Sequence, residues 1–87
     1  MDFSEKTIKA MSDFGLTGYE IKGYLTLLEF GSMSASAISE NSNVPYSKIY
    51  DVLNNLETKG WIEVQQSRPN KFYPKSPSSA LEIINLE

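Results

Sequence analysis

The sequence predicts a mainly α-helical domain with a β-hairpin wing, which is the winged helix-turn-helix fold. Two helical segments joined by a short polar turn lie within residues 34–60, the arrangement of a helix-turn-helix. Two short segments with strand patterning follow at once, separated by turn residues. The length of 87 residues suits one domain. We therefore expect a single domain over residues 1–87, with a core in 15–76 and a C-terminal helix in 77–87.

Two helices are expected before the helix-turn-helix. The first is predicted from a cap at Ser4 to about Asp13, with Ile8 and Met11 on one side. The second is predicted to begin at Thr17, which has capping-box spacing to an acidic residue, and to run to about residue 30. Its predicted buried stripe is Ile21, Tyr24, Leu25 and Leu28. The glycine inside it, Gly23, indicates close approach by a neighbouring helix.

The helix-turn-helix itself is predicted from caps and apolar spacing. Ser34 can cap a short helix over residues 35–41, and Val44 is expected to be buried at the corner that follows. Pro45 can open the next helix, and Gly60 can close it in a left-handed conformation. Its apolar stripe, at i, i+3, i+4 and i+7, comprises Ile49, Val52, Leu53 and Leu56.

The opposite face of this last helix is polar but carries few charges. It comprises Ser47, Asp51, Asn54 and Thr58, flanked by Tyr50 and Asn55. Hydroxyl and amide groups can read base edges in the major groove of DNA. The alternative is an ordinary solvated helix face.

The hairpin is predicted from alternation and turn residues. Residues 61–66 place Ile62 and Val64 on one face, and Trp61, Glu63 and Gln65 on the other. Residues 67–70 form the turn and 71–75 the returning strand, where Pro74 indicates an edge position. The tip presents Arg68, Asn70 and Lys71 together. We expect these side chains to contact phosphates or the minor groove, the alternative being a solvated turn.

A C-terminal helix is predicted to begin after Ser76, with Pro77 at its first position. Its apolar residues Leu81, Ile83 and Ile84 are expected to contact a second copy of the chain, with help from Ile8 and Met11. The expected functional unit is a homodimer on an inverted repeat, because one small domain covers a single half-site. In the alternative, these residues close the core of the monomer.

Composition excludes several classes of function. The chain lacks cysteine and histidine, so it has no disulfide, no thiolate metal site and no histidine base. It also lacks a glycine-rich phosphate loop, and we expect no enzyme activity, no cofactor and no metal site. No segment has the length of a membrane span or the pattern of a signal peptide. The expected location is therefore cytoplasmic, without contact to a membrane.

The net charge of −3 argues against nucleic acid, but the charge is unevenly distributed. Basic side chains outnumber acidic ones between Tyr46 and Lys75, whereas acidic ones dominate before Tyr46. A local basic face matters more for phosphate binding than the total charge does.

Several segments together resemble the N-terminal domain of the TrmB family of archaeal sugar-responsive transcriptional regulators. The matching segments are Leu16–Glu20, Tyr24–Gly31, Val44–Leu53, Leu56–Ile62 and Arg68–Tyr73, with Pro77. The resemblance implies a winged helix that binds promoter DNA. It also implies recognition-helix roles for Tyr46, Ser47, Lys48 and Tyr50, and wing roles for Arg68 and Lys71.

The sequence also departs from the family pattern. Asn70 stands where the family often has a second basic residue. The chain ends where a dimerisation segment and a sugar-binding domain would begin, so no small-molecule effector is expected. We expect either a stand-alone regulator or an excised domain.

Two functions from different classes remain open at this stage. The first is a sequence-specific regulator that binds double-stranded DNA through the helix and the wing. The second is a winged helix that binds another protein, which the acidic total and Asp51 on the polar face favour. Asp51 can also accept a hydrogen bond from cytosine or pair with Lys48 three residues earlier.

Overall fold

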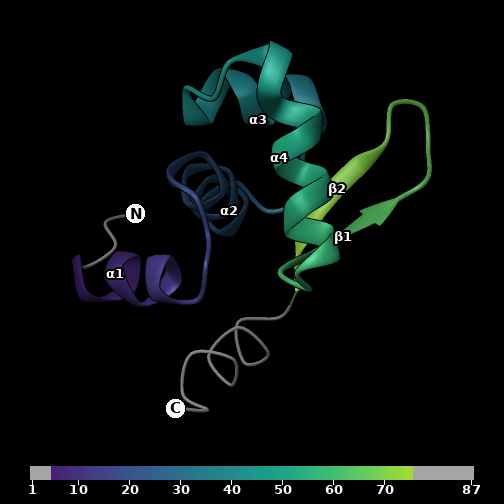
Figure 1. Ribbon diagram of the computed structural model, residues 1–87. Coiled ribbons are helices and arrows are strands. Elements are labelled where there is room, and N and C mark those ends of the chain that lie inside the picture. Colours follow the sequence, from purple (N-terminus) through teal and green to yellow (C-terminus); the bar gives the residue numbers. More distant parts are fainter. Residues whose placement is uncertain (1–4, 76–87) are drawn as a thin grey trace.

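Four helices precede a β-hairpin in the computed structural model, which describes residues 5–75 (Figure 1). The elements are α1 (Glu5–Asp13), α2 (Gly18–Phe30), α3 (Ala35–Ser42), α4 (Tyr46–Thr58), β1 (Ile62–Gln65) and β2 (Lys71–Pro74). Helices α3 and α4 form the helix-turn-helix, and the antiparallel pair β1–β2 forms the wing. Figure 1 shows α1 on one side of α2 and the wing beyond α4 on the other. The predicted winged helix-turn-helix fold is confirmed.

Local capping bonds fix the starts of α2 and α3 where the sequence predicts them. Thr17 Oγ1 accepts a hydrogen bond from the backbone N–H of Glu20 at 3.2 Å. Glu20 Oε1 accepts one in return from the N–H of Thr17 at 3.1 Å, which completes the capping box. Ser34 Oγ accepts from the N–H of Ala37 at 3.3 Å at the start of α3.

The turn between α3 and α4 is tighter than the sequence indicates. Helix α3 runs to Ser42, and Asn43 then adopts the left-handed conformation, with φ of 63°. Val44 is buried, as predicted, and its carbonyl oxygen accepts a hydrogen bond from Ser39 Oγ at 2.6 Å. Pro45 has the extended ψ of 139°, so it lies just before α4 and is not its first helical residue.

The apolar stripe of α4 is fully buried, which confirms that prediction. In α2 the prediction was partly wrong. Ile21, Tyr24 and Leu27 are buried, whereas Leu25 and Leu28 are only partly buried. Helix α2 contacts α1, α3, α4 and β2, so its buried surface extends around the helix and a single stripe does not describe it.

Gly23 lies where α2 packs against α4, but the space around it is not closed. A Cβ atom at Gly23 would lie 3.6 Å from Val52 Cγ1 and 3.7 Å from Leu56 Cδ1. Both distances correspond to ordinary van der Waals contact. The predicted helix neighbour is therefore present, but it does not require glycine at this position.

The junction between α4 and the wing is buried. The sequence placed Trp61 on the face opposite Ile62, but both side chains are buried. Trp61 precedes β1 and packs edge-to-face on Tyr24, with ring centroids 5.3 Å apart. Because Trp61 is not yet in the strand, the alternation of strand residues does not apply to it.

A third segment joins the hairpin, and the sequence did not indicate it. Met33, in the loop between α2 and α3, forms an antiparallel bridge with Phe72 of β2. The Met33 N–H donates to the Phe72 carbonyl at 2.9 Å, and the Phe72 N–H donates to the Met33 carbonyl at 2.7 Å. The wing is thereby attached to the helical body through backbone hydrogen bonds.

Some predictions concern residues outside the described range. These are the cap at Ser4, the helix start at Ser76 and Pro77, and the dimer residues Leu81, Ile83 and Ile84. Of the two residues expected to assist a dimer, Ile8 is exposed, but Met11 is buried in the monomer core. No helix within residues 5–75 is long and apolar enough to cross a membrane.

Candidate nucleic-acid interface

The exposed face of α4 is the face predicted from the sequence. Ser47, Asp51, Asn54 and Thr58 are all exposed, opposite the buried stripe. Because the stripe fixes the rotation of α4 against the core, these side chains cannot turn inward without unpacking the helix. The face therefore presents hydroxyl, amide and carboxylate groups to solvent in a fixed order.

Two tyrosines stand out on the first turns of α4. The side chains of Tyr46 and Tyr50 are 55% and 57% exposed. Their rings pack edge-to-face with centroids 5.9 Å apart, and their hydroxyl oxygens lie 3.4 Å from each other. The hydrogen bond between them raises the pKa of Tyr50 above its ordinary value. Large exposed aromatic rings that contact each other form a preordered surface for a binding partner.

The wing tip is held by its own polar groups. The Ser67 N–H donates to Asn70 Oδ1 at 3.1 Å, and Ser67 Oγ donates to the Pro69 carbonyl at 2.7 Å. Asn70 therefore shapes the turn through its side-chain oxygen. Arg68, within this turn, and Lys71, directly after it, are both exposed.

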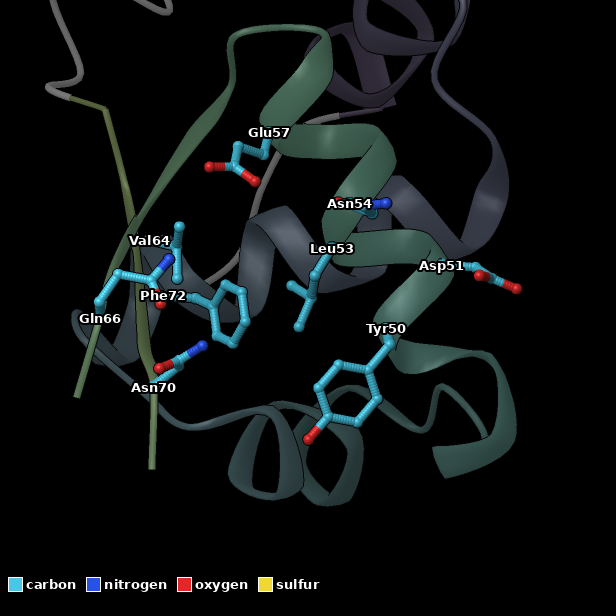
Figure 2. A pocket seen from close by; sticks show the side chains of 9 residues that line it. All are labelled: Tyr50, Asp51, Leu53, Asn54, Glu57, Val64, Gln66, Asn70 and Phe72. Atoms are coloured by element: carbon cyan, nitrogen blue, oxygen red, sulfur yellow. The ribbon is translucent and has the colours of Figure 1, made fainter. Parts of the chain in front are cut away.

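A cleft of about 370 Å³ lies between α4 and the wing. Figure 2 shows side chains from both sides pointing toward it. The lining residues are Tyr50, Asp51, Leu53, Asn54, Glu57, Val64, Gln66, Asn70 and Phe72. They include two carboxylates and three amides but no basic residue. The cleft thus brings Tyr50 and Asn54 of the helix together with Asn70 of the wing.

Basic residues lie at the margins of this surface rather than in the cleft. The side chains of Lys48, Arg68 and Lys71 are exposed and form no hydrogen bond or ion pair with another residue in the range 5–75. The Lys48–Asp51 pair left open by the sequence does not form there. These three cations are therefore available to an external anion.

Lys59, at the C-terminal end of α4, is paired within the protein. Lys59 Nζ lies 2.6 Å from Glu20 Oε1 and donates to the Gly15 carbonyl at 2.9 Å. Burial by itself would raise the pKa of Glu20. Hydrogen bonds from Lys59 and the Thr17 backbone, the charge of Lys59 and a bond from Asn55 outweigh it and hold that pKa below its ordinary value.

This tie joins the α1–α2 turn to the end of α4. The sequence did not indicate it. The capping-box spacing identified Glu20, but nothing local indicated a second partner from a distant segment.

Comparison with known proteins shows that the chain is similar to transcriptional regulators. Residues 11–78 match the family model described as "Sugar-specific transcriptional regulator TrmB". The HTH-type sugar sensing transcriptional regulator TrmBL1 of Pyrococcus furiosus is 38% identical over 80 residues, which cover 92% of this chain and 24% of that protein. The DNA-binding HTH-type transcriptional repressor TrmBL2 of Thermococcus kodakarensis is 38% identical over 69 residues, covering 79% of this chain and 26% of that protein.

A solved structure gives the same result for the fold. The structure of TrmBL2, described as an archaeal chromatin protein with a novel mode of DNA binding, superposes with a TM-score of 0.74 and 37% identity. It covers 82% of this chain and 28% of that chain. The chain thus spans about a quarter of the length of these relatives.

Proposed function

Because this chain belongs to the TrmB family of sugar-specific transcriptional regulators, we propose that it binds double-stranded DNA in a sequence-specific manner and regulates transcription. Helix α4 enters the major groove, and the wing contacts the backbone or the minor groove. A cytoplasmic location is part of the proposal, since promoter DNA lies there in cells without a nucleus. The proposal assigns the chain no catalytic step.

The observation that carries this proposal is the arrangement of charge around the exposed face of α4. The side chains of Lys48 on the helix and of Arg68 and Lys71 on the wing have no partner within the described residues and lie on both sides of a polar surface. Cations at the margins can hold two phosphate strands while uncharged groups between them face base edges. In this arrangement Tyr46, Ser47, Tyr50 and Asn54 contact bases from the helix.

Asn70 has a different role in this proposal. Its side-chain oxygen already accepts the Ser67 N–H, so it fixes the shape of the wing tip. The adjacent Arg68 and Lys71 make the phosphate contacts. Asn70 contributes only through its remaining amide N–H groups, and Figure 2 shows its side-chain nitrogen directed toward the cleft.

Salt-dependent binding tests the proposal. Fluorescence anisotropy with a labelled duplex should show affinity that falls steeply with salt, because each neutralised phosphate releases a counterion. Arg68→Ala and Lys71→Ala should each lower the salt slope by about one unit, with little change in sequence preference. Lys22→Ala, on the exposed side of α2, serves as the matched control and should leave the slope unchanged.

The protein-binding alternative predicts a different result. A protein partner need not show counterion release, and the acid-lined cleft with Asp51 and Glu57 is the observation that favours such a partner. If the double variant of Arg68 and Lys71 kept the wild-type salt slope, the wing would have no part in DNA binding. A wild type without any duplex affinity would leave the protein-interaction function as the better account.

We also propose that the protein acts as a homodimer on an inverted repeat. One domain with one recognition helix covers a single half-site, and two-fold symmetry doubles the contacts with half-sites about 10 base pairs apart. The contact residues proposed from the sequence are Leu81, Ile83 and Ile84. Sedimentation of the wild type and of a Leu81→Glu/Ile84→Glu variant tests this. A folded, monomeric variant that loses operator binding is expected, whereas a monomeric wild type with tight half-site binding would contradict it.

A further inference from the structure

We propose that Asp51 is a specificity-determining residue of this interface, which selects for a base that offers an amino group in the major groove. The inference rests on the proposed DNA-binding function. It concerns a residue that composition alone would place against DNA binding, because its charge repels phosphates.

The position of Asp51 puts its carboxylate on the surface that meets DNA. Asp51 is exposed near the middle of α4, one turn after Ser47 and one turn before Asn54. Both of those neighbours belong to the same exposed face. Figure 2 shows the Asp51 side chain extending outward from the helix, away from the core residue Leu53. A helix seated in the major groove by this face would bring the carboxylate to the base edges.

No cation within the described residues neutralises Asp51. Lys48, three residues earlier on the same helix, does not pair with it. Lys59, the next basic residue after Asp51 in the sequence, is paired with Glu20 and bonded to the Gly15 carbonyl. The residues of α4 that line the cleft together with Asp51 include Tyr50, Asn54 and the second acid, Glu57, and none is basic. Among the described residues, Asp51 therefore has no cationic partner when DNA approaches.

The chemistry of base edges makes the carboxylate of Asp51 selective among bases. An ionised carboxylate is only an acceptor of hydrogen bonds. In the major groove the donors are the amino groups of cytosine and adenine, whereas guanine O6 and N7 and thymine O4 are acceptors. At a site with cytosine or adenine the carboxylate gains a charge-assisted bond. Elsewhere it loses water without a partner and repels the phosphates as well.

This mechanism predicts two opposite changes on neutralisation. Without the negative charge, binding to unrelated duplex should become tighter. Discrimination at the base that Asp51 contacts should become weaker at the same time. A residue with a purely structural role would lower both kinds of binding together, so the opposite signs identify a specificity role.

The experiment begins with selection of preferred sequences by the wild-type protein from a random duplex library. The preferred duplex, its single base-pair substitutions and an unrelated duplex are then titrated with wild type, Asp51→Asn and Asp51→Ala at one salt concentration. At one position occupied by cytosine or adenine, discrimination should fall by about fivefold or more in both variants. Affinity for the unrelated duplex should rise severalfold. Asp51→Asn should also shift the preference toward adenine, because asparagine pairs with the adenine edge in a bidentate manner.

Glu5→Gln is the matched control, since Glu5 is an exposed acid on α1 and the substitution removes the same charge. It should change neither quantity beyond a small general effect of net charge. Equal gains in Glu5→Gln, or full discrimination in both Asp51 variants, would overturn the role of Asp51 alone. A wild type that binds no duplex would overturn the proposed function and this inference together.

Discussion

The two ends of α4 are built in opposite ways. At its C-terminal end, Lys59 is tied to Glu20 and to the Gly15 carbonyl, and Trp61 is buried against Tyr24. At its N-terminal end no side chain caps the helix, and its first turn carries no acidic residue. The exposed Tyr46, Ser47 and Lys48 lie at that open end.

This difference separates stability from recognition along one helix. The anchored end helps to fix the direction and rotation of α4 through long-range contacts, so the exposed side chains at the open end are not needed to position the helix. The exposed side chains at the open end can then serve binding without a role in stability. We expect substitutions at the anchored end to change the free energy of unfolding, and those at the open end to change binding.

The largest expected effect is the loss of the cation at the anchored end. Lys59→Met keeps the aliphatic stem and leaves Glu20, which is 2% exposed, without its charged partner. Removing one partner of a buried pair costs about 3–5 kcal/mol. The Lys59 side chain is 36% exposed, so water compensates in part and we expect a loss of about 2 kcal/mol. Urea unfolding measures it, and Lys22→Met on the surface of α2 should change stability by less than about 0.5 kcal/mol.

The same pair should make the anchored end sensitive to acid. The pKa of Glu20 in the folded protein is lowered from the ordinary value of 4.5. Ionised Glu20 therefore stabilises the fold at a pH above that value. The stabilisation is lost as the pH falls below about 4.5 toward the folded pKa. The difference in unfolding free energy between wild type and Glu20→Gln should therefore shrink on acidification. A difference that stays constant from pH 7 to pH 3 would contradict this account of the tie.

A smaller effect of opposite sign is expected where α2 packs on the anchored half of α4. Gly23→Ala adds a methyl group at ordinary contact distance from Val52 and Leu56. It also removes the entropic cost of glycine in a helix interior, about 0.5–1 kcal/mol. Thermal unfolding should show a higher midpoint than wild type. A lower midpoint would show that the two helices are packed too tightly to admit the methyl group.

The smallest change in stability is expected on the exposed face of α4, which begins at the open end and continues along the helix. Ser47→Ala and Asn54→Ala alter exposed side chains, so the unfolding free energy should stay within about 0.5 kcal/mol of wild type. Sequence discrimination should fall instead, by up to about 1–3 kcal/mol for a good bidentate contact. Competition binding with preferred and unrelated duplexes measures the second quantity. A large loss of thermal stability in either variant would show that this face is packed.

The sequence predicted features that depend on neighbours along the chain. The caps at Thr17 and Ser34, the buried stripe of α4 and the left-handed Gly60 all follow from local spacing. The exposed residues of the recognition face followed from the same stripe, because burying one side of a helix exposes the other.

Features that depend on distant segments were missed. The second partner of Glu20 comes from the far end of α4, and the partner of Phe72 comes from the loop before α3. Periodicity also failed for α2, because neighbours on several sides bury Leu27 as well as Ile21 and Tyr24. In each case the contact that determines the pairing or burial involves residues that are distant in the sequence.

The bridge between Met33 and Phe72 has a consequence for how the wing moves. Two strands of this length are not stable as an isolated hairpin, but here β2 is also bonded to the loop between α2 and α3. The base of the wing must therefore follow the helical body, whereas the tip from Ser67 to Asn70 is held by bonds within itself. The wing is thus attached to the helical body at the bridge between Met33 and Phe72. The amide hydrogens of these two residues exchange with solvent only when the bridge opens, so their exchange rates report how often the wing detaches.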